Sequence, residues 1–365
     1  MSVSSVEAAP TPAFGRSRLL LLLTIGCASG AAAPAHPRTP VSPTHRELEV
    51  PAEGLTLAGT LSLPAATSPV PGVLLVHGSG PNSRHQASRG QLGMGFGVEV
   101  ATFDALAAGL VERGIAVLRY DKRSCGPFNG CADNGYPPPS PELRADAFVD
   151  DAALMLDALG VAPEVDAARL FVVGHSQGAT FVPLLAEARP ALAAGVMLAA
   201  AHRPIDALLG AQRDLLVELL TEQGAPAEAI AQTTAPLDAA LAQLQLLRAG
   251  TLAGDTPVLG APALFWRSMI VLGERAEAAA QAVATPLLLV GGSYDWNVPL
   301  TEREAWETTL EEAGGPRTFR RFEGMTHALN WIAEPDRTQL GPADIGAHVH
   351  APLLDALAAF VRAPR

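Results

Sequence analysis

The sequence is short of basic residues, of charge in general and of long apolar runs, and each shortage argues against a class of protein. It has 25 lysines and arginines against 37 aspartates and glutamates, for a formal net charge of -12. No basic stripe is available to replace phosphate counterions, which argues against nucleic acid as a partner. Charged residues make up 17% and hydrophobic residues 48%, a balance typical of a globular α/β protein and not of a disordered chain.

The apolar run near the amino terminus, Leu19 to Ile25, is far shorter than the roughly 20 residues of a membrane-spanning helix. Arg16 and Arg18 precede it and small residues follow it, an order that resembles an export signal over residues 1–30. Cys27 lies where a bacterial lipoprotein signal carries its lipidated cysteine, although Thr24 stands where such signals have an aliphatic residue. We therefore expect an exported protein, periplasmic or anchored to the membrane by a lipid at Cys27, and otherwise secreted.

Cysteine is scarce, with three residues in the whole chain. Beyond Cys27, Cys125 and Cys131 lie six residues apart with glycine and proline between them, so they could close a small loop in an oxidising compartment. Two free thiols are the alternative. A zinc site is not expected, because no second cysteine pair or histidine cluster completes four ligands.

After an Ala/Pro-rich linker over residues 31–45, strands and helices alternate along the chain. Residues 46–64 alternate apolar and polar positions, which predicts an antiparallel hairpin at a sheet edge. A glycine-rich loop is expected at 91–97 and a helix over 98–113. Buried strands are expected within 72–76, 115–120, 169–173, 194–200, 285–292 and 317–322. This order predicts βαβ units and a mostly parallel, doubly wound sheet with an N-terminal antiparallel hairpin.

The alternation stops between residues 202 and 284, where leucines recur at helical spacing and no strand pattern occurs. We expect an all-helical lid inserted into a core formed by residues 46–201 and 285–365. Extra helices on a sheet edge, without a role in binding, are the alternative. Four aromatic residues suit either an acyl pocket or ordinary core packing: Phe265, Trp266, Trp296 and Trp331.

The strand over 169–173 leads into Gly174-His175-Ser176-Gln177-Gly178 and then directly into an apolar helical segment. A serine between a buried strand and a helix lies on a sharp turn, and the two glycines allow the strand and the helix to cross closely. The pattern predicts an exposed hydroxyl at the top of the sheet.

Serine-based acyl transfer also needs a base, an acid that orients the base, and donors for the oxyanion. Asp295 and His327 follow two later strands, in the chain order Ser, Asp, His that this architecture uses. The backbone N–H groups of Gln177 and Ser79 are the candidates for the oxyanion hole. Asp121 is expected to pair with Lys122, Arg123 or a backbone group and not to act as a second acid.

These motifs together resemble the α/β-hydrolase superfamily, and within it the bacterial esterases and serine aminopeptidase (S33)-like enzymes. The resemblance lies in the serine pentapeptide, His77-Gly78-Ser79-Gly80-Pro81, Arg119-Tyr120-Asp121-Lys122-Arg123, Asp295 with Val298-Pro299, and His327. It implies a serine hydrolase of small carboxylic esters or amides that works without metal or organic cofactor. One departure is that Ser124 and Cys125 follow Arg123 where that branch often has glycine, which alters the rim of the site.

Three alternatives to an esterase stay open. An aminopeptidase or amidase would need acidic residues to bind a free ammonium, and the expected lid offers Asp206, Asp214, Glu218 and Glu222. A thioesterase or acyltransferase would use the same triad. A binding protein on an inactive hydrolase fold is disfavoured by the intact Ser, Asp and His set. The oligomeric state is left open.

Overall fold

The computed structural model describes residues 44–91, 94–127, 130–134, 140–253, 256–332 and 348–364. The expected export signal with Cys27 and most of the expected linker lie outside these ranges. The linker prediction is wrong at its end, because Thr44 and His45 already pair with Leu63 and Ser62 in the first hairpin. Within the described ranges, no helix is both long and apolar enough to cross a bilayer.

The main sheet has eight strands in the order β1-β2-β6-β3-β7-β8-β11-β12. In that order the strands are β1 (Thr44–Ala52), β2 (Leu55–Leu63), β6 (Ala116–Tyr120), β3 (Val70–Val76), β7 (Val165–His175), β8 (Ala194–Leu198), β11 (Leu287–Tyr294) and β12 (Arg317–Thr326). The strand β2 is antiparallel to both of its neighbours, and all other pairs are parallel. The prediction of a mostly parallel sheet with an antiparallel N-terminal hairpin is confirmed.

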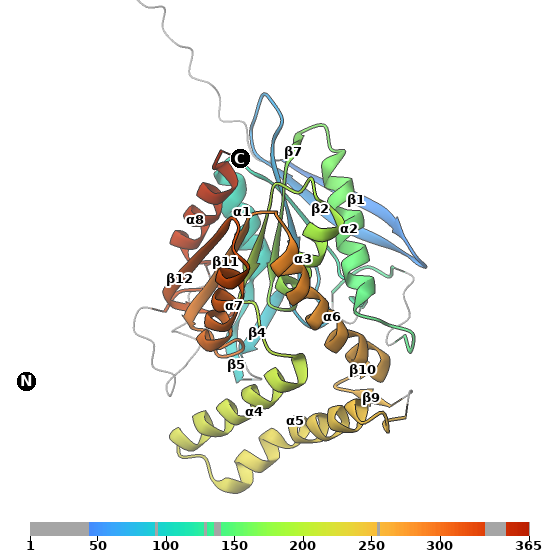
Figure 1. Ribbon diagram of the computed structural model, residues 1–365, viewed down its shortest axis with the longest axis vertical. Coiled ribbons are helices and arrows are strands. Elements are labelled where there is room, and N and C mark those ends of the chain that lie inside the picture. The colour runs from blue at the N-terminus through green and yellow to red at the C-terminus, as the bar shows by residue number, and fades with distance from the viewer. Residues whose placement is uncertain are drawn as a thin grey trace, which may run out of the picture. The chain divides into compact units, whose positions relative to one another are not determined.

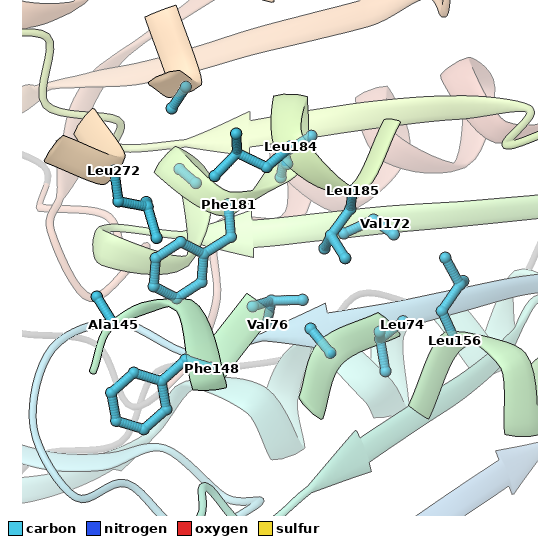
Figure 2. Packing of buried hydrophobic residues seen from close by; sticks show 14 of the residues in the cluster. Leu74, Val76, Ala145, Phe148, Leu156, Val172, Phe181, Leu184, Leu185 and Leu272 are labelled. Carbon is cyan, nitrogen blue, oxygen red and sulfur yellow. The ribbon is translucent and has the colours of Figure 1, made fainter. Parts of the chain in front are cut away.

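Helices cover both faces of the sheet (Figure 1). One face carries α1 (Thr102–Glu112) and α8 (Ala351–Arg362); the other carries α2 (Asp146–Gly160), α3 (Gln177–Ala188), α6 (Ala263–Ala282) and α7 (Leu300–Ala313). Successive residues of a central strand point to opposite faces, so β3 supplies both layers. Leu74 and Val76 pack with α2 and α3, whereas Val73 and Leu75 pack with α1 and α8. Figure 2 shows the first of these layers, with Val172 of β7 beside Leu185.

A second, two-stranded sheet lies where a glycine-rich loop and the start of a helix were expected. It consists of β4 (Ala87–Gln91) and β5 (Met94–Ala101), which pair antiparallel. The helix therefore begins at Thr102 and not at Val98. The prediction failed because Val98-Glu99-Val100 alternates apolar and polar residues at the period of a strand. Residues 87–91 supply a strand for it to pair with, and this pairing prevails over the local helical spacing.

The segment 202–284 contains α4 (Ile205–Glu222), α5 (Ala227–Arg248), β9 (Pro257–Val258), β10 (Ala261–Pro262) and α6. The prediction of an all-helical segment is wrong, since β9 and β10 form a short antiparallel ribbon. The last helix of the segment, α6, packs against α3 in the layer that covers the sheet. Its buried residues include Ala276, Ala279 and Ala280, and helical periodicity alone does not reveal the partner of this face.

A buried ion pair joins the end of β6 to α2. Arg123 donates to the two carboxylate oxygens of Asp151 at 2.8 and 2.6 Å, and both side chains are buried. The same helix carries a matched exposed pair, in which Arg189 donates to Asp157 at 2.9 and 2.7 Å. The two pairs share a bidentate geometry and differ in burial.

We expect Asp151→Ala to lower the free energy of unfolding by about 3–5 kcal/mol, because it leaves the Arg123 guanidinium buried without this carboxylate. Asp157→Ala should cost about 0–1 kcal/mol, because water solvates the exposed arginine. Urea unfolding of the two variants measures the difference. Equal losses would contradict the idea that burial makes the Asp151 carboxylate indispensable to Arg123.

Candidate active site

Ser176 lies on the sharp turn between β7 and α3. Its backbone has φ 55° and ψ −120°, a conformation that side-chain-bearing residues rarely adopt. The Ser176 N–H donates to the carbonyl of Leu198 at the end of β8, 2.9 Å away, which anchors the turn to the neighbouring strand. The hydroxyl thereby reaches a pocket above the carboxyl ends of the strands.

Two glycines make this turn sterically feasible. A Cβ on Gly174 would lie 2.2 Å from the carbonyl oxygen of Gly178, and a Cβ on Gly178 would lie 2.2 Å from the carbonyl oxygen of Val76. These are backbone atoms on β3 and α3 that cannot rotate away. The start of α3 is therefore held against the ends of β7 and β3 at a distance that excludes any side chain.

Asp295 and His327 form a hydrogen-bonded pair beside the turn. Asp295 follows β11 and is buried, and its Oδ2 lies 2.8 Å from Nδ1 of His327, which follows β12. Its Oδ1 accepts the backbone N–H of Val298 at 2.8 Å, so the carboxylate is oriented from both sides. A histidine that donates from Nδ1 carries its lone pair on Nε2, the nitrogen that a general base uses. Ser176 and His327 line the same pocket.

His175 links this pair to the loop that follows β3. Its Nε2 lies 2.7 Å from the carbonyl oxygen of His327, and its Nδ1 lies 2.8 Å from the side-chain nitrogen of Gln86. Burial, and secondarily His327, lowers the pKa of His175 to about 3, so the ring is neutral. Since a carbonyl only accepts, Nε2 carries the hydrogen and Nδ1 accepts from Gln86. Gln86 in turn accepts the Gly78 N–H at 2.9 Å.

The expected oxyanion residues both line the pocket. Gln177 is the first residue of α3, so its N–H is one of the donors that a helix leaves without an intrahelical acceptor. Ser79 follows Gly78, whose Cα is so close to Ser176 that a Cβ there would lie 3.2 Å from the Ser176 Cβ. Both residues are therefore close neighbours of the serine in the same pocket.

The pocket has a volume of about 730 Å³ and is walled mainly by apolar side chains. Its large apolar lining residues come from α2 and the residue stretch before it, from α4, from the turn between β9 and β10, and from the start of α6: Leu143, Phe148, Ile205, Leu208, Leu209, Leu259, Phe265 and Trp266. No aspartate or glutamate occurs among the described residues that line it, and Lys122 is its one lysine. Of the four aromatic residues considered in the sequence, Phe265 and Trp266 line the pocket and the other two do not. Trp296 is buried against Tyr294, and Trp331 is 47% exposed.

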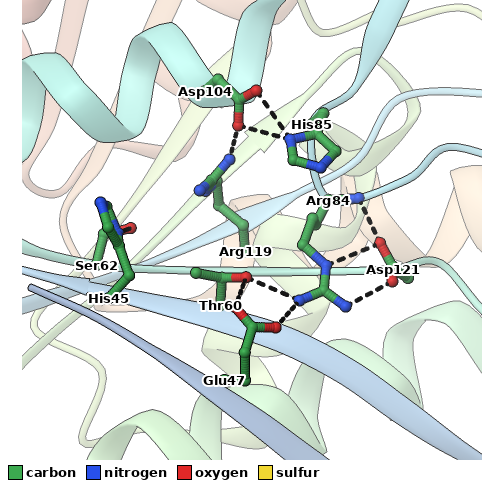
Figure 3. A network of polar contacts seen from close by, with 9 residues as sticks. All are labelled: His45, Glu47, Thr60, Ser62, Arg84, His85, Asp104, Arg119 and Asp121. Atoms are coloured by element: carbon green, nitrogen blue, oxygen red, sulfur yellow. Dashed lines mark hydrogen bonds and ion pairs between the residues drawn. The ribbon is translucent and has the colours of Figure 1, made fainter. Parts of the chain in front are cut away.

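Of the partners expected for Asp121, the backbone group is confirmed, because its Oδ1 accepts the Arg84 backbone N–H at 2.7 Å. Lys122 and Arg123 do not pair with it; the Arg84 guanidinium donates to the carboxylate at 3.1 and 2.7 Å instead. Figure 3 shows Arg84 between Asp121 and Glu47. The sequence could not indicate this, because Arg84 reaches Asp121 from a loop 37 residues away.

Two of the residues that build the site, Gln86 and Lys122, were not predicted as site residues. Gln86 carries no local sequence signal. Lys122 carries one, since it is the only lysine in 365 residues. It is buried directly after β6, and burial lowers its pKa to about 7.

Cys125 and Cys131 form a disulfide, with Cα atoms 5.7 Å apart, in the segment that follows Arg123. The neighbouring Ser124 lines the pocket, so the disulfide loop adjoins the rim of the site. No group of histidine, cysteine and acidic residues suited to a metal ion occurs in the part of the chain that the structure describes.

Comparison with known proteins agrees with this geometry. Residues 92–336 match the family model described as serine aminopeptidase, S33. The chain belongs to this family of α/β hydrolases. The resemblance read from the sequence motifs is therefore confirmed.

Among curated proteins, this S33-like hydrolase is 30% identical over 277 residues to esterase EstD of Thermotoga maritima. That match covers 75% of the chain and 58% of EstD, so the chain spans little more than half of that relative's length. Among solved structures it shares the fold of Est1E from Butyrivibrio proteoclasticus, with a TM-score of 0.50, 15% identity, and coverage of 86% of this chain and 96% of that one. The α/β hydrolase GrgF from Penicillium sp. sh18 also has a TM-score of 0.50, at 17% identity, with 79% and 91% covered.

The close crossing at the serine turn can be tested with Gly178→Ala. The added methyl would meet the Val76 carbonyl oxygen at 2.2 Å, so we expect a strongly destabilised protein with little soluble yield. Gly210→Ala is the matched control, because a Cβ at this position in α4 meets nothing within 4 Å and alanine favours a helix by about 1 kcal/mol. Thermal unfolding and soluble yield report both; a normally stable Gly178→Ala would refute the steric argument.

Proposed function

We propose that this protein is a serine carboxylesterase in which Ser176 is the nucleophile, His327 the general base and Asp295 the residue that orients it. The observation that carries the proposal is the 2.8 Å contact between Asp295 and His327 beside a strained serine in the same pocket. The name of the relative EstD and the family match agree with an ester hydrolase.

In this mechanism, His327 Nε2 accepts the Ser176 hydroxyl proton while the serine oxygen attacks the ester carbonyl carbon. The resulting oxyanion receives hydrogen bonds from the Ser79 and Gln177 backbone N–H groups. His327 then returns the proton to the departing alcohol, leaving an acyl-enzyme. Water, deprotonated by the same histidine, attacks the acyl carbon, and the carboxylic acid product leaves with Ser176 regenerated.

The charge of the pocket favours esters over the free amino termini that an aminopeptidase must bind. A substrate ammonium needs a carboxylate partner, and the described lining offers none. Of the four acidic residues considered for that role, Asp206 is bound by Arg248 at the surface and Asp214 pairs with Arg213. None of the four lines the pocket. Thioesterase and acyltransferase chemistry would use the same catalytic groups.

The segment that contains α4 is proposed to act as a lid over the site. Ile205, Leu208 and Leu209 of α4 line the pocket, and the Gln212 side chain donates to the carbonyl of Asn297 at 2.6 Å. Asn297 lies two residues after Asp295, so the contact ties α4 to the loop that carries the proposed acid. Residues 259–262 close the same pocket from the ribbon that precedes α6.

Ser176→Ala should abolish turnover of short p-nitrophenyl esters, with a loss of about 10⁴-fold or more, because the acyl-enzyme cannot form. Asp295→Asn should keep the fold and lose a comparable factor, since the tautomer of His327 is no longer held. The measurement is kcat/KM over a panel of esters, thioesters and aminoacyl anilides, together with labelling by a fluorophosphonate. Preference for anilides would favour the aminopeptidase, and undiminished activity of Ser176→Ala would refute the proposed nucleophile.

We also propose that the protein is exported and that Cys27 is lipidated. The disulfide between Cys125 and Cys131 supports an oxidising compartment, where such bonds persist. Expression of the full chain in a bacterium with labelled palmitate should label the wild-type protein and not Cys27→Ser. A cleaved but unlabelled wild-type protein would indicate plain secretion, and an uncleaved cytoplasmic protein would contradict export.

A further inference from the structure

The chain uses lysine once. Of its 25 basic residues, 24 are arginine and the remaining one is Lys122. This lysine is 3% exposed, and none of the ion pairs between described residues includes it. Its neighbours Asp121 and Arg123 are bound to Arg84 and Asp151 instead. Burying an ammonium without a carboxylate is unfavourable, so stability does not explain its presence.

Lys122 contacts Gln177 and the Gly78–Ser79 peptide, which carry the two backbone N–H groups proposed to form the oxyanion hole. Its Nζ donates to the carbonyl oxygen of Gly78 at 2.8 Å and to the side-chain oxygen of Gln177 at 2.8 Å. The Phe148 ring centroid lies 4.4 Å from Nζ and provides an attractive face for the positive charge. The nitrogen of the Gln177 side chain points to the Met269 sulfur at 3.3 Å, so the oxygen is directed to Lys122.

The bond to Gly78 determines where the Ser79 N–H points. The Gly78 carbonyl and the Ser79 N–H belong to one planar, trans peptide, so they point in opposite directions. A donor that holds the carbonyl on one side therefore directs the N–H to the other side. Asn82 adds a second donor to the same carbonyl at 3.0 Å, and Gln86 fixes the Gly78 N–H at 2.9 Å.

We propose that Lys122 is the positioning residue of the oxyanion hole, holding the Gly78–Ser79 peptide and Gln177 so that both backbone N–H groups face the oxyanion formed at Ser176. This role rests on the proposed esterase function and extends it to a residue that does not touch the reacting atoms. A single ammonium that bridges the two halves of the hole also fixes their separation. Lysine suits the position because its compact ammonium donates in several directions, whereas the planar guanidinium of arginine is larger.

The decisive variant is Lys122→Met, which keeps an unbranched apolar chain under Phe148 and removes both hydrogen bonds. We expect kcat for a p-nitrophenyl ester to fall about 10–100-fold with KM changed less than about threefold, because the lost interactions matter in the transition state. Inhibition by a trifluoromethyl ketone, which forms a tetrahedral adduct with the serine, should weaken by a similar factor. A kcat/KM within about twofold of wild type would overturn the proposal.

Leu110→Ala is the control that distinguishes a positioning role of Lys122 from a merely structural one. It truncates a side chain in the core on the opposite face of the sheet. That variant should lower the melting temperature more than Lys122→Met does and leave kcat unchanged. A fall in kcat shared by both variants would show that lost stability, and not lost positioning, causes the effect. Should Lys122→Met fail to fold, Lys122→Leu is the second variant, because it also removes both hydrogen bonds. A kcat/KM within about twofold of wild type there would overturn the proposal.

A crystal structure tests the positioning role without measuring turnover, so its outcome is independent of the proposed esterase function. In a crystal structure of Lys122→Met we expect the Gly78–Ser79 peptide to be rotated or the Gln177 side chain to be redirected, relative to the wild-type protein. An unchanged peptide and side chain would overturn the positioning role even in an active enzyme. A wild-type protein that neither hydrolyses esters nor reacts with a fluorophosphonate would instead overturn the proposed function, while the crystal structures would still decide the role of Lys122.

Discussion

The rest of the site depends on the contact between the backbone of α3 and the ends of β7 and β3. Gly174 and Gly178 bring these elements closer than any side chain allows, and Ser176 adopts a positive φ as a result. The same crossing brings the start of α3 and the loop after β3 close to the serine. One steric constraint thus positions the hydroxyl and the N–H groups proposed to stabilise the oxyanion.

Neutral side chains connect the serine turn to the neighbouring loops by hydrogen bonds and ring contacts. His175 is uncharged because it is buried, and it joins the carbonyl of His327 to Gln86, which holds Gly78. His77 is also buried and neutral, with a pKa lowered to about 3 chiefly by burial, and it packs between the rings of Phe103 and Tyr120. Neutral histidines can fix loop geometry without adding a charge that would compete with the proposed base for a proton.

The sequence was sufficient to predict the fold class and the three strand ends that carry Ser176, Asp295 and His327. Buried parallel strands are continuous apolar runs, and their order along the chain determines which ends meet. Gln86 and Lys122 could not be placed in the same way, because Lys122 meets Gly78 across 44 residues and Gln86 meets His175 across 89. The packing of α6 on α3 was missed for a related reason, since an apolar helical face does not reveal its partner.

The ion pairs after β6 leave Lys122 as the residue of that segment whose side chain is available to the pocket. Asp121 is neutralised by Arg84 and Arg123 by Asp151, and the charges of these pairs largely cancel at a distance. Lys122, which lies between them in sequence, has no carboxylate partner among the described residues and lines the pocket. The Lys122 amino group therefore donates to Gly78 and Gln177, the residues that border the proposed oxyanion hole.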